Sequence, residues 1–215
     1  MMLEKIVKRN KPVTRIILVI IGVCAMGVGL YFLDHIKFGT DSWSTFNLAL
    51  SRKFGMSYGN TLLIANLIAL IFVLLFGRRE IGIGTIANMV LVGYAKDFSE
   101  WLFGKFIPDS FFEPFLNRCL ILIPAMAWFI VAVAIYVAVD LGTSPFDAVP
   151  NILARRIAKI PFMYLRITYD ALWAVLGFFL GGTVGAVTVL IALFLGPCIT
   201  WVKHKLEKTF GFIND

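Results

Sequence analysis

Charged side chains are scarce in this sequence. Of its 215 residues, 15% are Asp, Glu, Lys or Arg, whereas 60% are hydrophobic. Soluble globular domains are nearer to about 45–50% apolar, and a water-soluble fold of this size could not bury so much apolar surface. The composition therefore excludes a water-soluble globular protein.

Chemically reactive side chains are also few. The sequence has three cysteines and two histidines, and it contains no Ser/His/Asp arrangement, no HExxH and no Cys/His cluster with metal-ligand spacing. Cys24, Cys119 and Cys198 lie in or at the edge of apolar segments, which is typical of small packing residues. We therefore expect no enzyme, no cofactor and no metal site.

Acidic residues are outnumbered by basic ones, 13 against 20, which gives a formal net charge of +7. The cations gather at the ends of apolar runs, as in cytoplasmic loops under the positive-inside rule, so nucleic acid is not an expected partner. The first apolar run, residues 16–33, has no cleavage site after it and is interpreted as a retained membrane span. Another run, residues 119–139, also reaches the ~20 residues that cross a bilayer.

The chain is interpreted as two tandem copies of one unit, offset by 103 residues. This offset aligns pairs of like residues without a gap: Arg15 with Arg118, Gly39-Thr40 with Gly142-Thr143, Arg52-Lys53 with Arg155-Arg156, and Gly82, Thr85 and Gly93 with Gly185, Thr188 and Gly196. We predict an all-α, polytopic membrane helix bundle. Its parts are residues 1–97 (first repeat), 98–117 (amphipathic aromatic connector at the membrane interface), 118–203 (second repeat) and 204–215 (cytoplasmic tail).

Each unit is predicted to hold four helical segments. They cover residues 16–35, 42–54, 59–77 and 82–96 in the first unit, and 119–139, 145–158, 162–180 and 184–202 in the second.

The short second segment of each unit decides the predicted topology. Residues 43–54 would span only ~18 Å as a helix, against a hydrocarbon core of ~30 Å. Polar residues such as Asn47, and Asp147 in the counterpart, are costly at the centre of a lipid-facing span. We therefore expect re-entrant half-helices and three true spans per unit, which inverts the second unit relative to the first. The distribution of cations alone favours eight spans, and both arrangements place the two termini in the cytoplasm.

Two features are candidates for ligand binding. Asp41 and Ser144 each follow a Gly-Thr pair as predicted N-caps, and half-helix N-termini also bind polar or anionic groups in membrane transporters. Arg166 and Asp170 share one helix face at membrane depth, either as an ion pair that fixes packing or as an anchor for an anion or a proton. The full candidate set is Arg166, Asp170, Asp147, Ser144, Asp41, Thr40, Thr143 and Asn66.

An ordered series of motifs resembles the YczE/YyaS/YitT-type bacterial integral membrane proteins. The motifs are Gly142-Thr143-Ser144-Pro145-Phe146-Asp147, Ala154-Arg155-Arg156, Arg166 with Asp170, and Leu180-Gly181-Gly182-Thr183-Val184-Gly185 through Gly196-Pro197, with Gly39-Thr40-Asp41-Ser42-Trp43 and Gly84-Thr85-Ile86-Ala87-Asn88 in the first half. Ser42 stands where a proline is usual, and Ser44 where the family tends to have an acid. The resemblance implies a multi-span protein of the bacterial cytoplasmic (inner) membrane and says little about its chemistry.

Together these features predict a secondary transporter or exporter of a small polar or amphiphilic solute, with its site between the two half-helices near the bilayer midplane. The alternative is a non-transporting membrane partner, either an assembly helper or a ligand-capturing subunit of a larger transporter, which would dock through the aromatic connector. Membrane lipid and a small-molecule solute are the expected partners, and the sequence also allows a homodimer.

Overall fold

The computed structural model describes residues 12–157 and 159–210, and within these ranges the chain is helical without strands. The basic residues Lys5, Lys8, Arg9 and Lys11 and the last part of the predicted tail lie outside the described residues. The elements in chain order are α2 (Pro12–His35), α3 (Ser42–Phe54), α4 (Tyr58–Phe76), η1 (Arg78–Glu80), α5 (Ile83–Phe103), η2 (Asp109–Phe112), α6 (Phe115–Val139), α7 (Pro145–Arg156), α8 (Phe162–Phe179) and α9 (Ala186–Phe210).

Most predicted helices occur within a few residues of their expected bounds. The last helix of each predicted unit differs, because α5 continues to Phe103 instead of ending near residue 96, and α9 continues to Phe210 instead of ending near residue 202. Residues 98–103, expected in the connector, are therefore helical, and η2 lies between α5 and α6. Within the described residues, three helices are long and apolar enough to cross a membrane: α2, α4 and α6.

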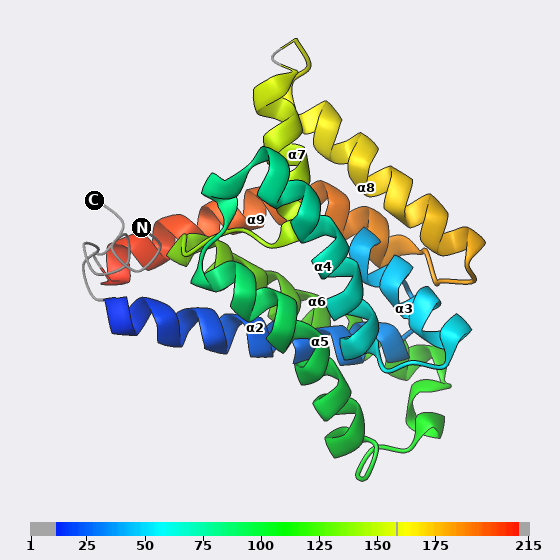
Figure 1. Ribbon diagram of the computed structural model, residues 1–215. Helices are drawn as coiled ribbons and strands as arrows, with labels where there is room; N and C mark the ends of the chain where they lie inside the picture. Colours follow the sequence, from blue (N-terminus) through cyan, green and yellow to red (C-terminus); the bar gives the residue numbers. More distant parts are fainter. Residues whose placement is uncertain (1–11, 158, 211–215) are drawn as a thin grey trace.

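Helices α2 and α6 pack side by side in opposite directions at the centre of the molecule (Figure 1). Gly22 lies against Ala132, whereas Gly29, further along α2, lies against the earlier residue Phe129. The indole N–H of Trp128 donates to the carbonyl of Ala25 at 2.9 Å. Small residues at such contacts let membrane helices approach closely, because their van der Waals packing replaces a hydrophobic driving force.

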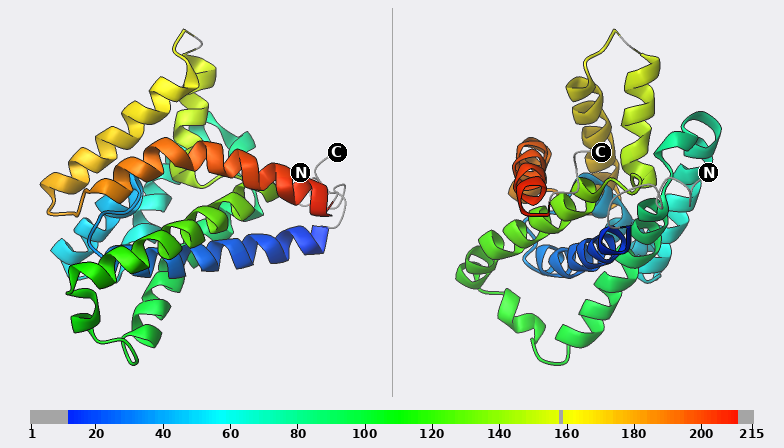
Figure 2. Two further views of the ribbon diagram at one scale, coloured as in Figure 1. Left: turned by 180° about the vertical axis from the view of Figure 1, so that it is seen from behind. Right: turned by 90° about the vertical axis from the view of Figure 1, so that its left-hand side faces the viewer.

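The remaining helices flank this central pair. Helix α5 packs on α2 and α9 packs on α6, while α3 packs on α8 and α4 packs on α7. Two views at right angles show the hairpin of α7 and α8 projecting away from the central pair (Figure 2). The short helices α3 and α7 thus each lie beside a longer helix from the other half of the sequence.

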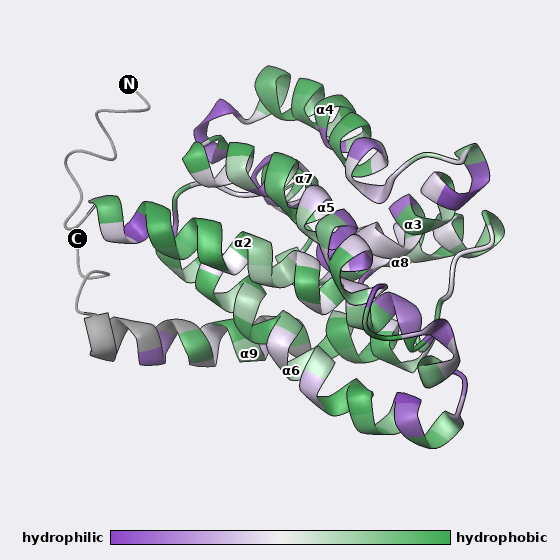
Figure 3. Ribbon diagram, turned by 90° about the horizontal axis from the view of Figure 1, so that it is seen from below, coloured by the Kyte–Doolittle hydropathy of each residue, from purple (hydrophilic) through white to green (hydrophobic). Residues whose placement is uncertain are grey.

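Apolar side chains cover much of the outer surface. Ile68 and Leu75 of α4 are 66% and 69% exposed, and Phe179 of α8 is 80% exposed. Hydropathy colouring shows long hydrophobic stretches on α2, α4 and α6, with hydrophilic positions around α3 and α5 (Figure 3). A surface of this kind suits contact with lipid and would make a soluble monomer aggregate.

Candidate functional site

Two glycine turns bring the N-termini of α3 and α7 into place. Gly39 and Gly142 adopt φ angles of 98° and 113°, which L residues rarely adopt. A Cβ on Gly142 would also lie 2.5 Å from the backbone nitrogen of Gly82. Each turn is held by the other half of the chain: Gly84 N–H donates to the Leu141 carbonyl at 2.8 Å, and Val187 N–H donates to the Phe38 carbonyl at 3.0 Å.

The predicted N-caps form at both short helices, α3 and α7. The side chain of Asp41 accepts from the backbone N–H of Ser44, and that of Ser144 accepts from the N–H of Asp147. Pro145 occupies the first turn of α7, where its missing N–H costs no helical hydrogen bond. These caps confirm the predicted starts of the two short helices.

The two N-termini meet at the middle of α8. The guanidinium of Arg166 contacts Asp147 Oδ1 of α7 at 2.6 Å and Asp170 Oδ2 of its own helix at 2.8 Å. The other carboxylate oxygens accept from hydroxyls: Asp170 Oδ1 from Ser42 at 2.9 Å and Asp147 Oδ2 from Ser144 at 2.6 Å. The predicted Arg166–Asp170 contact is confirmed, and the contacts extend to the short helices α3 and α7.

Asp41 completes this group, which we call the central charge cluster: Asp41, Asp147, Arg166 and Asp170. Asp41 interacts electrostatically with both Asp147 and Asp170. Its Oδ1 accepts from Ser44 N–H at 3.0 Å, whereas its Oδ2 is shielded from solvent and has no hydrogen-bond partner in the part of the chain that the structure describes. The cluster holds three carboxyl groups and one guanidinium, so it carries an excess of negative charge when all are ionised.

Aromatic rings form a wall beside the central charge cluster. The Trp43 and Phe146 rings stack with centroids 4.6 Å apart, Trp173 meets Trp43 edge-on at 4.7 Å, and Tyr169 lies 4.7 Å from Phe146. The Arg166 guanidinium carbon lies 5.7 Å from the centre of the Phe146 ring, within cation–π range. The wall gives the polar cluster an apolar side. The sequence analysis did not identify this wall, although the offset of 103 residues aligns Trp43 with Phe146.

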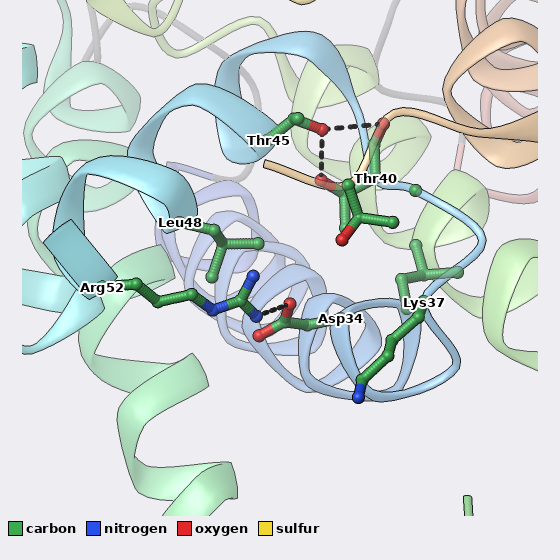
Figure 4. A pocket seen from close by; sticks show the side chains of 9 residues that line it. Asp34, Lys37, Thr40, Thr45, Leu48 and Arg52 are labelled. Carbon is green, nitrogen blue, oxygen red and sulfur yellow. Dashed lines mark hydrogen bonds and ion pairs between the residues drawn. The ribbon is translucent and has the colours of Figure 1, made fainter. Parts of the chain in front are cut away.

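The other predicted ligand residues lie elsewhere. Thr40 shares a 2.8 Å hydroxyl contact with Thr45, beside a small pocket lined also by Asp34 and Arg52 (Figure 4). Asn66 is buried in α4, and its side-chain oxygen has no partner among the described residues. The candidate set therefore divides, with Arg166, Asp170, Asp147, Ser144 and Asp41 together and Thr40, Thr143 and Asn66 apart from them.

Thr143 belongs to a second polar group centred on Glu80. The Glu80 carboxylate contacts Arg155 at 2.6 Å and accepts from Thr143 at 3.1 Å and from Asn151 at 3.2 Å. Sequence reasoning missed Glu80, because it follows Arg78-Arg79 at a helix end, where a solvated acid is ordinary. Arg155 sits at the position in α7 that Arg52 occupies in α3, and Arg52 pairs instead with Asp34.

A hollow of about 420 Å³, which we call the vestibule, opens between the ends of α2, α3 and α5 and the start of α4. Its lining includes Asp34, Arg52, Tyr58, Lys96, Glu100 and Trp101. Lys96 lies 2.8 Å from Glu100 and 3.4 Å from Asp34, so opposite charges partly neutralise one another there. The hollow lies beside the later part of α3, at Leu48, Ser51 and Arg52, and has Tyr58 in its lining.

The fold and the apolar surface define a helical integral membrane protein. The chain belongs to the family described as "Family of unknown function (DUF6198)", which it matches over residues 13–204. It is 25% identical over 193 residues to the "Uncharacterized membrane protein YczE" of Bacillus subtilis (strain 168), covering 89% of this chain and 84% of the relative. No solved structure matches. The predicted resemblance to a YczE-type membrane family is confirmed.

Proposed function

We propose that this protein is a secondary transporter of a small polar or amphiphilic solute, built as a six-span inverted repeat. The solute would bind at the central charge cluster, near the bilayer midplane. The protein would lie in the bacterial cytoplasmic (inner) membrane with both termini in the cytoplasm, and it would carry no enzymatic activity.

The opposite directions of α2 and α6 support six spans. If α3 crossed the bilayer, three spans would separate α2 from α6, and the two helices would run in the same direction. If α3 re-enters, α4 and α5 alone cross between them, and α6 runs back. The observed order of contacts, with Gly22 against Ala132 and Gly29 against Phe129, supports the second arrangement.

Paired contacts at the offset of 103 residues support the repeat. Arg15 donates to the carbonyl of Val139 at the end of α6, and Arg118 donates to the carbonyl of Ile36 just after α2. At the offset of 103 residues, Arg15 corresponds to Arg118 and Ile36 corresponds to Val139. The two hydrogen bonds are therefore equivalent when the two units are exchanged. Such reciprocity is expected of two copies related by a twofold axis, which lies in the membrane plane when the central helices are antiparallel.

The observation that carries the transport proposal is the placement of three carboxyl groups and one guanidinium where two half-helix N-termini meet. Ionisable groups at membrane depth are costly and usually mark pathways for a substrate or an ion. The aromatic wall offers the apolar part of an amphiphilic solute a surface, and the excess of carboxylates favours a cationic over an anionic head.

Rapid solute jumps on protein reconstituted in lipid vesicles would test transport. The probes are an organic amine, a carboxylate, a zwitterionic amino acid and a neutral sugar, read as charge displacement on a supported membrane. We expect a signal with the amine that Asp170→Asn removes while insertion and folding are kept. Absence of any signal that depends on Asp170, from a correctly folded protein, would contradict transport.

The exposed connector favours a second candidate, a non-transporting partner protein. Trp101, Phe106 and Phe115 are 57%, 76% and 69% exposed on and around the connector. These aromatics would suit the membrane interface or a docking protein. Under this alternative, replacing Phe106 and Phe111 with Ser would release a co-purifying protein, and vesicles would show no Asp170-dependent solute signal.

A further inference from the structure

A chain of hydroxyl groups joins the vestibule to Asp41. Tyr58 lines the vestibule, and its hydroxyl donates to Ser44 Oγ at 3.2 Å. Ser44 in turn donates its backbone N–H to Asp41 Oδ1 at 3.0 Å, and its hydroxyl acts electrostatically on the same carboxyl group. Tyr58 and Ser44 are both buried, so this chain of hydroxyls runs through packed side chains.

Asp41 is the carboxyl group of the central charge cluster that has room for a proton. Both oxygens of Asp147 and both oxygens of Asp170 already contact Arg166 or a serine hydroxyl. Asp41 Oδ2 has no such partner and no solvent contact. A buried carboxylate oxygen without a donor is costly, and adding a proton removes its charge.

The charged groups around Asp41 come from two packed helices, and a third supplies a hydroxyl. Asp147 of α7 and Asp170 of α8 repel a negative charge on Asp41, and Arg166 of α8 is engaged by those two carboxylates. From α4, Tyr58 contributes a hydroxyl. A proton on Asp41 thus relieves repulsion that Arg166 does not offset.

We propose that Asp41 is the proton-carrying group of this protein and that protons reach it from the vestibule through Tyr58 and Ser44. Water in the vestibule gives a proton to the Tyr58 oxygen while Tyr58 passes its own proton to Ser44. Ser44 passes its hydroxyl proton to Asp41, so both hydroxyls are restored and the carboxylate becomes a carboxylic acid. A role for this proton transfer in driving solute movement rests on the proposed transport function.

The relay belongs to one half of the molecule. At the offset of 103 residues, Tyr58 corresponds to Pro161, Asp41 to Ser144 and Ser44 to Asp147. The second unit therefore lacks both the first hydroxyl and the terminal acid at the equivalent positions. In this conformation, protons are therefore expected to reach Asp41 from the vestibule side.

Infrared difference spectroscopy on the full chain in lipid bilayers tests this without any solute, so its result is independent of whether transport is found. The buffer pH is stepped down, and the absorption band of protonated carboxyl groups is followed in time. We expect Asp41→Asn to remove a band that Asp109→Asn, at an exposed site, leaves in place. Because Asn is as good an N-cap as Asp, α3 should be kept.

The rate at which the band of the protonated carboxyl group appears tests the route through Tyr58 and Ser44. Tyr58→Phe removes the first hydroxyl, and we expect protonation at least about tenfold slower with an unchanged final amplitude, as for other positioned proton-transfer groups. Tyr94→Phe is the matched control, because its hydroxyl bonds Asn60 away from the relay. A band that persists in Asp41→Asn would overturn Asp41 as the carrier, and wild-type rates in Tyr58→Phe would overturn the route.

Discussion

Arg166 is stabilised in a membrane protein because two carboxylates of different helices share its guanidinium. Its side chain is 28% exposed and contacts Asp147 and Asp170 through different nitrogens. Moving a charge out of water costs several kcal/mol, and good geometry with full hydrogen bonding offsets that cost. The anion-binding role expected for Arg166 is therefore less favoured than a role in balancing the two acids.

Replacing Arg166 should destabilise the fold, because Arg166 is the counter-charge of Asp147 and Asp170. We expect Arg166→Ala to lower the free energy of unfolding by about 2–4 kcal/mol, because two carboxylates are left without a counter-charge. Thermal or denaturant unfolding in detergent micelles measures the change. Arg79→Ala, at an exposed site, should change it by less than about 0.5 kcal/mol.

A second substitution tests the cause of that loss. Asp147→Asn in the Arg166→Ala background should recover part of the lost stability, since it removes one of the unpaired charges. If Arg166→Ala is as stable as the wild type, the three-way contact does not contribute to folding.

Local spacing predicted some residue contacts and not others. Arg166 and Asp170 are four residues apart on one helix, so their contact follows from helical geometry. Asp147 and Glu80 meet their arginines only because separate helices pack together, at sequence distances of 19 and 75 residues. No local pattern carries that information.

At the scale of elements, the Gly-Thr turns fix where the half-helices begin. The carbonyl of Leu141 contacts the start of α5, and the carbonyl of Phe38 contacts the start of α9. A side chain on the glycine that faces each carbonyl would therefore clash with backbone atoms. Gly82 and Gly185 stand opposite these carbonyls, and a Cβ on Gly82 would lie 1.9 Å from the Leu141 oxygen. Close backbone approach, rather than flexibility, explains these glycines.

Alanine at the two turn glycines should be strongly destabilising. We expect Gly39→Ala and Gly142→Ala each to cost about 2–3 kcal/mol, from the positive φ and the backbone clash together. Gly181→Ala is the control, because Gly181 has a φ of 90° but no atom within 4 Å of an added Cβ. It should cost about 1 kcal/mol. Unfolding midpoints in detergent measure the stability of all three variants. Equal losses of stability in the three would exclude a contribution from the backbone clash at Gly39 and Gly142.

The whole molecule reveals the relation between the two halves. Central helices that run in opposite directions place the start of α6 on the side where α2 ends. Under the six-span arrangement, the vestibule opens on the outer side and the Glu80–Arg155 group lies on the cytoplasmic side. The two polar groups would then stand at opposite ends of one pathway through the central charge cluster.

Cysteine accessibility in a cysteine-free background tests this topology. We expect Ser57→Cys and Ser110→Cys to react with a membrane-impermeant reagent from outside, and Lys159→Cys to react only after the membrane is opened. All three positions are exposed, whereas Ser99 is buried and unsuited to labelling. Labelling of Ser57→Cys and Ser110→Cys only from the cytoplasm would mean that α3 crosses, against the observed packing.

The sequence by itself determined the membrane class through its composition, the two N-caps through residues within one turn of one another, and the family through an ordered series of motifs along the chain. It also placed Arg166 and Asp170 on one face. Only the tertiary structure decided that Asp147 joins them, that Glu80 takes Thr143 away from the central charge cluster, and that α2 and α6 run in opposite directions. These depend on packing between distant segments, where the free energy of burying charge is set by partners that no local spacing specifies.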